Sequence, residues 1–347
     1  MSSLTADAAS DEFPRLSLPP ARGPWMESLY ALLDHRPAPV RDPDPPPAET
    51  VMFDHDLQLA LYLCYELHYG GLAGVDDRYE WSPLVLMLRA AMEAQFERAL
   101  GTLVSPSPRR EATVGAELQQ LVRADDGPPL SVYVERQASY EQALELVIHR
   151  SAYQLKEADP HSWAIPRLHG GPKAALVEIQ FDEYGEGRAE HIHAELYAGT
   201  MRALGLDASP GVYLGRLPGI TLATVNLMSW FGLHRRLRGS AIGHLAVFEL
   251  TSSVPNRRYA NGWRRLGADE DVTRFYSVHV EADAVHESIA TWDLANALAT
   301  QQPELAPDIV FGGRALLALD AAWGHHLLRC WERGESSLLE PLPAGDE

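Results

Sequence analysis

Apolar side chains recur every three or four residues along most of the chain after residue 50, which is the spacing of an amphipathic helix. A first helix is predicted to begin after Asp54, whose side chain can cap it, and to end at Gly70. A second is predicted to follow Ser82, another capping residue type. Residues 51–126 are therefore predicted to form accessory N-terminal helices.

Residues 127–335 are predicted to form the body of the molecule, because helical spacing continues there between Pro and Gly breaks. Strand-like alternation is scarce, so the predicted fold class is all-α, a bundle of about seven helices. The body helices are expected at residues 131–159, 172–185, 189–207, 221–237, 239–254, 272–298 and 314–334.

The two ends of the chain have a different composition. Residues 1–50 are rich in Pro, Asp and Ala, which predicts an extended arm that lacks a helix. Residues 336–347 are predicted to be an acidic tail. The helices expected at residues 54–101 carry more apolar surface than a free hairpin can leave in water, so we expect them to pack on the body or on a second copy, with a homodimer as the expected assembly.

Charge and cysteine content narrow the possible partners. The formal net charge of −19 disfavours nucleic acid and anionic membrane surfaces, and no apolar run approaches the ~20 residues that span a bilayer. The two cysteines, Cys64 and Cys330, lie in apolar surroundings typical of buried free thiols. The N-terminus does not resemble a signal peptide, so a cytoplasmic location is expected.

The sharpest chemical pattern lies in FYSVHVEADAVH, where His279, Asp283 and His286 occupy positions i, i+4 and i+7. A helix turns ~100° per residue, so these three side chains share one narrow stripe. Two imidazoles and a carboxylate form a ligand set for iron or manganese. The surrounding valines make the helix apolar, and a buried charged stripe would need a partner such as a metal.

A second pattern, FDEYGEGRAEHIHAELY, leaves two alternatives open. Glu190 and His193 are three residues apart and would share one helix face. Glu183 and His193 are ten residues apart, ~15 Å along an unbroken helix, but the glycines at 185 and 187 can interrupt it. Local spacing alone favours Glu190.

These motifs resemble those of the heme-oxygenase-like diiron oxidases and oxygenases, over roughly residues 130–330. Within that family the chain looks closest to its N-oxygenase subgroup, which includes the central domain of the enzyme that forms the N-nitrosourea of streptozotocin. The resemblance implies a heme-oxygenase-like bundle with accessory N-terminal helices. It also implies seven metal ligands in this sequence: Glu157, Glu183, His193, Glu249, His279, Asp283 and His286. Glu249 and Asp283 are expected to act in catalysis as well.

The resemblance implies a cofactor of two iron ions, cycling between Fe2+ and Fe3+, with O2 as co-substrate and a peroxo-diferric intermediate. It also implies a small-molecule substrate and an external electron donor, and Glu249 favours N-oxygenation of an amine or guanidine. The alternatives are an iron-binding or storage protein, or an oxidative decarboxylase or C–C lyase of the same fold. Four carboxylates would neutralise two Fe(II) ions in a dry core, and metal binding would help to fold the site.

Overall fold

A computed structural model of the chain describes residues 15–35, 46–104 and 111–342, without the side chains of residues 281–284. The α-helices are α1 (Pro24–Leu33), α2 (His55–Glu66), α3 (Pro83–Leu103), α4 (Val114–Arg123), α5 (Leu130–Arg136), α6 (Tyr140–Gln154), α7 (Asp159–Ser162), α8 (Gly170–Glu183), α9 (His193–Ala203), α10 (Gly219–Leu233), α11 (Arg238–Leu250), α12 (Ser253–Arg265), α13 (Glu270–Ser288), α14 (Ala297–Gln301) and α15 (Ala306–Glu332). A π-helical segment, Ile289–Asn296, continues α13 into α14. The all-α prediction is confirmed.

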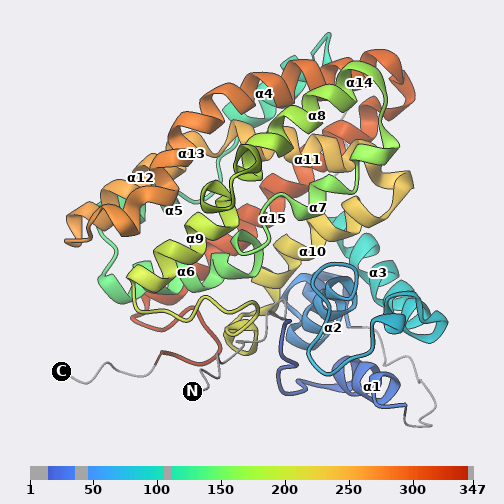
Figure 1. Ribbon diagram of the computed structural model, residues 1–347, viewed down its shortest axis with the longest axis vertical. Helices are drawn as coiled ribbons and strands as arrows, with labels where there is room; N and C mark the ends of the chain where they lie inside the picture. Colours follow the sequence, from blue (N-terminus) through green and yellow to red (C-terminus); the bar gives the residue numbers. More distant parts are fainter. Residues whose placement is uncertain (1–14, 36–45, 105–110, 343–347) are drawn as a thin grey trace, which may run out of the picture.

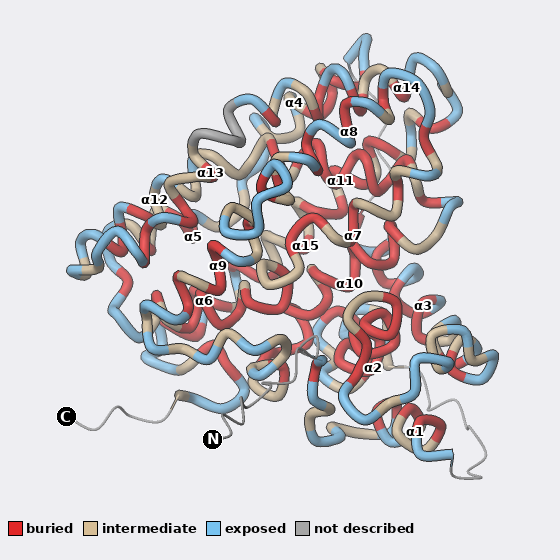
Figure 2. Tube along the Cα trace, in the orientation of Figure 1, coloured by how far each residue is buried: buried red, intermediate tan, exposed pale blue. Residues whose placement is uncertain are grey.

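The centre of the body is the contact between α11 and α15, which lie among the most deeply buried helices in Figure 2. Glycines allow their backbones to touch. A Cβ atom on Gly243 would lie 1.7 Å from the carbonyl oxygen of Ile309, and one on Gly312 would lie 2.0 Å from that of Ser240. This close approach fixes α11, the helix that carries Glu249.

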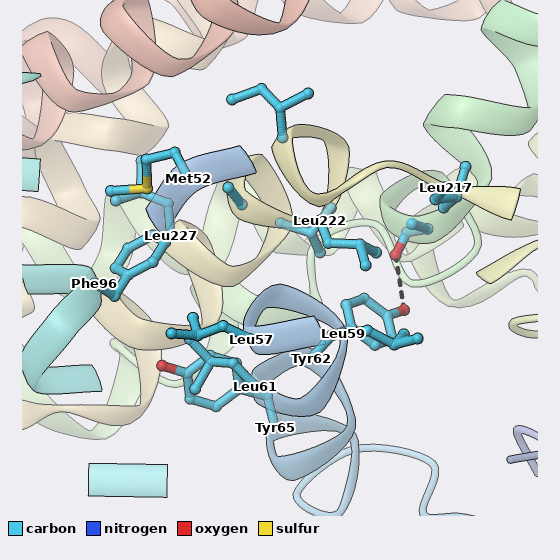
Figure 3. Close-up of a cluster of buried hydrophobic side chains, with 14 of the residues drawn as sticks. Met52, Leu57, Leu59, Leu61, Tyr62, Tyr65, Phe96, Leu217, Leu222 and Leu227 are labelled. Atoms are coloured by element: carbon cyan, nitrogen blue, oxygen red, sulfur yellow. Dashed lines mark hydrogen bonds between the residues drawn. The ribbon is translucent and has the colours of Figure 1, made fainter. Parts of the chain in front are cut away.

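The accessory helices share a hydrophobic core with the body. Leucines of α2, including Leu57 and Leu61, pack toward Phe96 of α3 and Leu222 and Leu227 of α10 (Figure 3). α4, which the sequence grouped with the accessory helices, packs against α11 and α15. The domain boundaries stay a prediction, but the apolar core is continuous across them.

The extended arm predicted for residues 1–50 is wrong for residues 24–33, which form α1. Proline is tolerated in the first turn of a helix, where its missing N–H is not needed. Behind Pro24, the side chains of Trp25, Met26 and Leu29 are almost completely buried. Residues 1–14 and 36–45 of the predicted arm lie outside the described residues.

The single helix predicted for residues 131–159 is also wrong, because the chain breaks between α5 and α6. Ser139 caps α6, and its hydroxyl accepts a hydrogen bond from the Gln142 backbone N–H while the Gln142 side chain accepts one from the Ser139 N–H. This capping box starts a new helix inside an unbroken apolar pattern. Helix α12 was not predicted, and α9 begins at His193 rather than at residue 189.

The described start of the predicted acidic tail is attached to the body. Ser337 is buried, and both its N–H and its hydroxyl donate hydrogen bonds to Glu145 of α6. Cys64 and Cys330 are buried free thiols, as predicted. Within the described ranges no helix is long and apolar enough to cross a membrane.

We predict that Gly243→Ala lowers the free energy of unfolding by about 1–3 kcal/mol, because the added methyl group would overlap the backbone of α15. Urea denaturation followed by circular dichroism measures this change. Gly101→Ala is the control: nothing lies within 4 Å of its Cβ position, so helix propensity should make that variant neutral or more stable by up to about 1 kcal/mol. Equal stability of the two variants would contradict the close-packing account.

Candidate metal centre

Six of the seven predicted ligands come together from five separate segments of the body. Glu157 follows α6, Glu183 ends α8, His193 begins α9 and Glu249 lies in the last turn of α11. Two more come from α13, and Figure 1 shows α8, α9, α11 and α13 arranged around the same part of the body. All six side chains are buried: Glu157, Glu183, His193, Glu249, His279 and His286. The side chain of Asp283 lies outside the described residues.

The six side chains form two groups that share one carboxylate. In the first group, ligand atoms of Glu157, Glu183, His193 and His279 all lie within 4.8 Å of one another. In the second, those of Glu183, Glu249 and His286 do so. Three histidines from two helices, His193 on α9 and His279 and His286 on α13, therefore face one cluster of carboxylates.

Glu183 offers one oxygen to each group. Its Oε2 atom lies 2.7 Å from His193 Nδ1 in the first group. Its Oε1 atom lies 3.5 Å from His286 Nδ1 in the second, and Glu249 Oε2 lies 3.6 Å from the same nitrogen. A carboxylate in this position can bridge two cations, one on each oxygen.

The chain reaches this arrangement by leaving the helix after Glu183. Gly185 and Gly187 adopt φ angles of 67° and 80°, in the left-handed region that favours glycine. A Cβ atom on Gly185 would lie 2.6 Å from the His191 backbone, so the turn is also too tight for a side chain. The structure therefore brings Glu183 to His193, whereas Glu190, which local spacing favoured, is exposed and belongs to neither group.

The donor atoms fit a metal ion better than they fit one another. Four buried atoms of this cluster have no hydrogen-bond partner among the described residues: Glu157 Oε2, Glu183 Oε2, His193 Nδ1 and His286 Nδ1. The short His193–Glu183 contact is not aligned as a hydrogen bond. A buried polar atom left without a partner costs ~1–3 kcal/mol, and four at one place point to a cation. A cavity of about 10 Å³ lies among Glu157, Glu183, Glu249 and His279.

Neighbouring oxygens fix how two of the imidazoles present their nitrogens. The Nδ1 atom of His279 lies 2.9 Å from the Phe275 carbonyl oxygen, so this nitrogen carries the proton and Nε2 faces Glu157. His286 Nε2 lies 2.9 Å from Asp182 Oδ2, which leaves Nδ1 toward the carboxylates. An oxygen behind a ligating histidine is a common way to orient it. Sequence reasoning missed Asp182 as a partner of His286, because the two residues are far apart in the chain and no local spacing pairs them.

Without a cation the imidazoles attract protons. Burial lowers the pKa of His286, but Glu249, Glu183 and Asp182 outweigh this effect and raise it to about 9. Burial likewise lowers the pKa of His193, and Glu183 raises it above its usual value. Burial raises the pKa of Glu183, while His193, His279 and His286 together bring it below normal. Metal binding at neutral pH would therefore displace protons.

A buried salt bridge anchors the segment that carries Glu157. Lys156 Nζ lies 2.8 Å from Glu66 Oε2 on α2, and the Tyr62 and Tyr69 rings flank the ammonium group at 4.1 and 4.7 Å. The next residue but one, Ala158, has a φ of 73°, and its carbonyl oxygen accepts a hydrogen bond from Gln180. Accessory helix α2 thus holds the backbone beside a predicted ligand.

Comparison with known proteins assigns the chain that carries this cluster to a family. A family model described as "Iron-containing redox enzyme" matches residues 144–321, just over half of the chain. The chain belongs to this family of iron-containing redox enzymes. All seven predicted ligands fall inside the matched range, and the predicted heme-oxygenase-like fold is confirmed.

Other comparisons add little to the iron-containing redox enzyme assignment. No curated protein matches the sequence. Among solved structures, the chain is similar to a CADD-like protein of unknown function from Nostoc punctiforme, with 20% identity and a TM-score of 0.49. That similarity covers 62% of this chain and 96% of the other, and at this level it carries no argument about function.

We predict that the metal-free protein loses stability as the pH rises from about 6.5 through about 9. The folded pKa of His286 is raised to about 9 from 6.5, so its contribution is fully present below the unfolded pKa and is lost above the folded one. The loss is on the order of 3 kcal/mol. Thermal melts across this range, in chelator, measure it, and His286→Gln should flatten the curve. An equally steep fall in that variant would show that other groups cause it.

We predict that Lys156→Met lowers Fe(II) affinity by about tenfold or more, because the backbone beside Glu157 loses its anchor on α2. Anaerobic titration calorimetry on the folded variant measures this affinity. Arg236→Met is the control, since the Arg236–Glu97 pair also joins an accessory helix to the body but contacts no predicted ligand. Similar affinity losses in both variants would mean that general loosening, and not the Glu157 segment, is responsible.

Proposed function

We propose that this iron-containing redox enzyme is a non-heme diiron oxidoreductase that uses O2 to oxidise a small molecule. The observation that carries the proposal is the placement of Glu183, whose two oxygens face two separate groups of buried donors. One ion would be held by the first group and the second ion by the other. Carboxylate and imidazole are ligands that suit both Fe(II) and Fe(III).

The proposed ligand set contains four carboxylates and three imidazoles. Asp283, assigned by the family resemblance alone, would complete it on α13. The four negative charges of Glu157, Glu183, Glu249 and Asp283 balance two Fe(II) ions, so the loaded site would carry no net charge inside the core. Glu249 and Asp283 are also our candidates for catalytic roles beside the reacting molecule.

Iron in this site would supply the electrons that O2 needs to react with a closed-shell substrate. The chain's own residues prepare the site for that chemistry. Asp182 and the Phe275 carbonyl hold protons on the outward nitrogens of His286 and His279, so that the inward nitrogens can ligate. The rings of Phe248 and Phe275 pack around the cluster and keep bulk water away.

Within this proposal, N-oxygenation of an amine or guanidine is the finer hypothesis, and it rests on Glu249 and on the resemblance to the N-oxygenase subgroup. Oxidative decarboxylation and C–C cleavage are the alternatives of the same fold. The alternative outside the enzymes is an iron-storage protein. A large cleft beside the cluster favours an enzyme with an organic substrate over a storage protein. An external electron donor and a homodimeric assembly belong to the proposal as well.

We predict that the wild-type protein binds two Fe(II) per chain under anaerobic conditions and that its melting temperature rises by several degrees. Glu183→Gln should lower affinity for both ions by about 100-fold or more, because one side chain serves both groups. Calorimetry and elemental analysis measure these quantities. Glu190→Gln, at an exposed position, is the matched control and should behave as the wild type.

Stopped-flow absorption and oxygen-electrode measurements on the Fe(II) protein then test the reaction. An enzyme should consume O2 faster, and repeatedly, when its substrate and a reductant are present. Binding of a single iron, or of none, would overturn the diiron proposal. Two irons with O2 uptake that no amine, guanidine, carboxylic acid or amino acid accelerates would favour storage.

A further inference from the structure

A cleft of about 500 Å³ opens beside the proposed metal centre. Its lining comes from the α4–α5 connection, α6, α9, α11, α12, α13 and α15. The cleft extends from the exposed residues Asp125 and Val254 to Tyr197 and Phe275, which are almost completely buried. The cleft therefore leads from the surface of the body into its interior.

The inner end of the cleft touches the metal centre. The Phe275 ring lies 4.1 Å from the His279 imidazole between centroids, and its carbonyl oxygen is the partner of His279 Nδ1. Phe248 lines both this cleft and the small cavity among the predicted ligands. The side chains of Phe248 and Phe275 therefore lie between a molecule at this end and the site where oxidation is proposed.

Two opposite charges stand on the wall of the cleft. The Arg150 guanidinium stacks over the Trp323 ring at 4.3 Å, and Asp320 lies on α15 beside it. Burial works against the charge on Arg150, yet Asp320 and Tyr259 keep its pKa above normal, whereas burial raises the pKa of Asp320. Within the described part of the chain, Arg150 and Asp320 attract each other but form no ion pair within 4.0 Å, and Arg150 also interacts with the Tyr259 hydroxyl. A guanidinium has five N–H donors and a carboxylate has two oxygen acceptors, so both groups keep hydrogen-bonding capacity for a ligand.

Helix α6 leads from this charged pair toward the segment that carries Glu157. Arg150 and Gln154 stand one helical turn apart on α6, and Glu157 follows the end of that helix. Among the described residues, Gln154 Oε1 is buried and has no hydrogen-bond partner, although it also lines the cleft. Arg150 and Gln154 are ~6 Å apart along the helix axis at a rise of 1.5 Å per residue, and Gln154 is three residues before Glu157. A short molecule bound at Arg150 and Gln154 therefore extends toward the segment that carries Glu157.

We propose that this cleft binds the substrate and that the substrate is a small zwitterion, with its anionic group on Arg150 and its cationic group on Asp320. Gln154 Oε1 accepts a further hydrogen bond from the ligand, and the remainder of the ligand points toward Phe275. That the ligand is a substrate rests on the proposed diiron function, whereas its binding does not.

Charge balance selects a zwitterion over a simple anion or cation. Arg150 and Asp320 together are neutral, and a ligand that carries one charge of each sign leaves the sum unchanged. An anion alone would satisfy Arg150 but would add a second negative charge beside Asp320, at a cost that rises in a partly buried site. A cation alone would satisfy Asp320 but would add a second positive charge beside Arg150.

The test compares four probes with the metal-free protein by titration calorimetry: L-norleucine, 6-aminohexanoate, hexanoate and hexylamine. At least one of the two zwitterions should bind about tenfold or more tightly than both singly charged probes. Arg150→Gln should weaken that zwitterion by about tenfold or more, as expected for loss of a charged hydrogen bond. Arg98→Gln, an exposed change on α3, is the control and should leave binding unchanged.

Asp320→Asn separates recognition from a structural role, because it keeps the shape of the side chain. This variant should bind the zwitterion more weakly and hexanoate more tightly than the wild type, since Arg150 is then no longer opposed. Equal binding of all four probes, or an unchanged order in Asp320→Asn, would overturn the proposal. Because iron is absent, these results do not depend on the Fe(II) titration that tests the diiron centre.

Discussion

Several carboxylates and imidazoles buried at one point are unstable together unless a multivalent cation joins them. Here the cluster lies in a helical core where water cannot solvate the charges. Protons offset part of the cost, as the raised pKa of His286 indicates, but four ligand atoms of the cluster still form no hydrogen bond with the described residues. The stability of the core and the capacity to bind iron are therefore one property of this protein.

The rest of the fold fixes the donors against that mutual repulsion. Backbone contact at Gly243 and Gly312 fixes the position of α11 against α15, and with it the position of Glu249. A left-handed turn at Gly185 redirects the chain so that Glu183 and His193 meet. Gly185 lies two residues after Glu183, and Gly243 lies on the same helix as Glu249. Rigid placement of ligands on several elements is what distinguishes such a centre from a loose acidic surface.

Sequence reasoning could predict what local periodicity determines. It predicted the helical class, most helices of the body, and the shared stripe of His279 and His286, since these follow from spacing along one helix. Glu157 and Glu249 carry no local signal, and only the family resemblance selected them. Their position depends on how distant helices pack.

Contacts between distant segments could not be predicted in the same way. The pairing of Lys156 with Glu66, and the facing positions of Arg150 and Asp320, join residues 90 and 170 positions apart. Helix α1 was missed because the proline-rich composition of residues 1–50 resembles that of a linker, although the one proline of α1 lies in its first turn, where it is compatible with a helix. Local spacing even favoured Glu190, because the turn at Gly185 that brings Glu183 to His193 is a tertiary feature.

The unbroken core between α2 and α10 has a consequence for how this architecture can change over time. An accessory segment joined by a linker alone can be lost or exchanged without harm to the rest. Here, removal of α2 would expose Leu222 and Leu227 to solvent and would take away the partner of Lys156. We therefore infer that the N-terminal helices and the proposed metal site can be kept or lost only together, so the unit on which selection acts is larger than the helices that carry the candidate ligands.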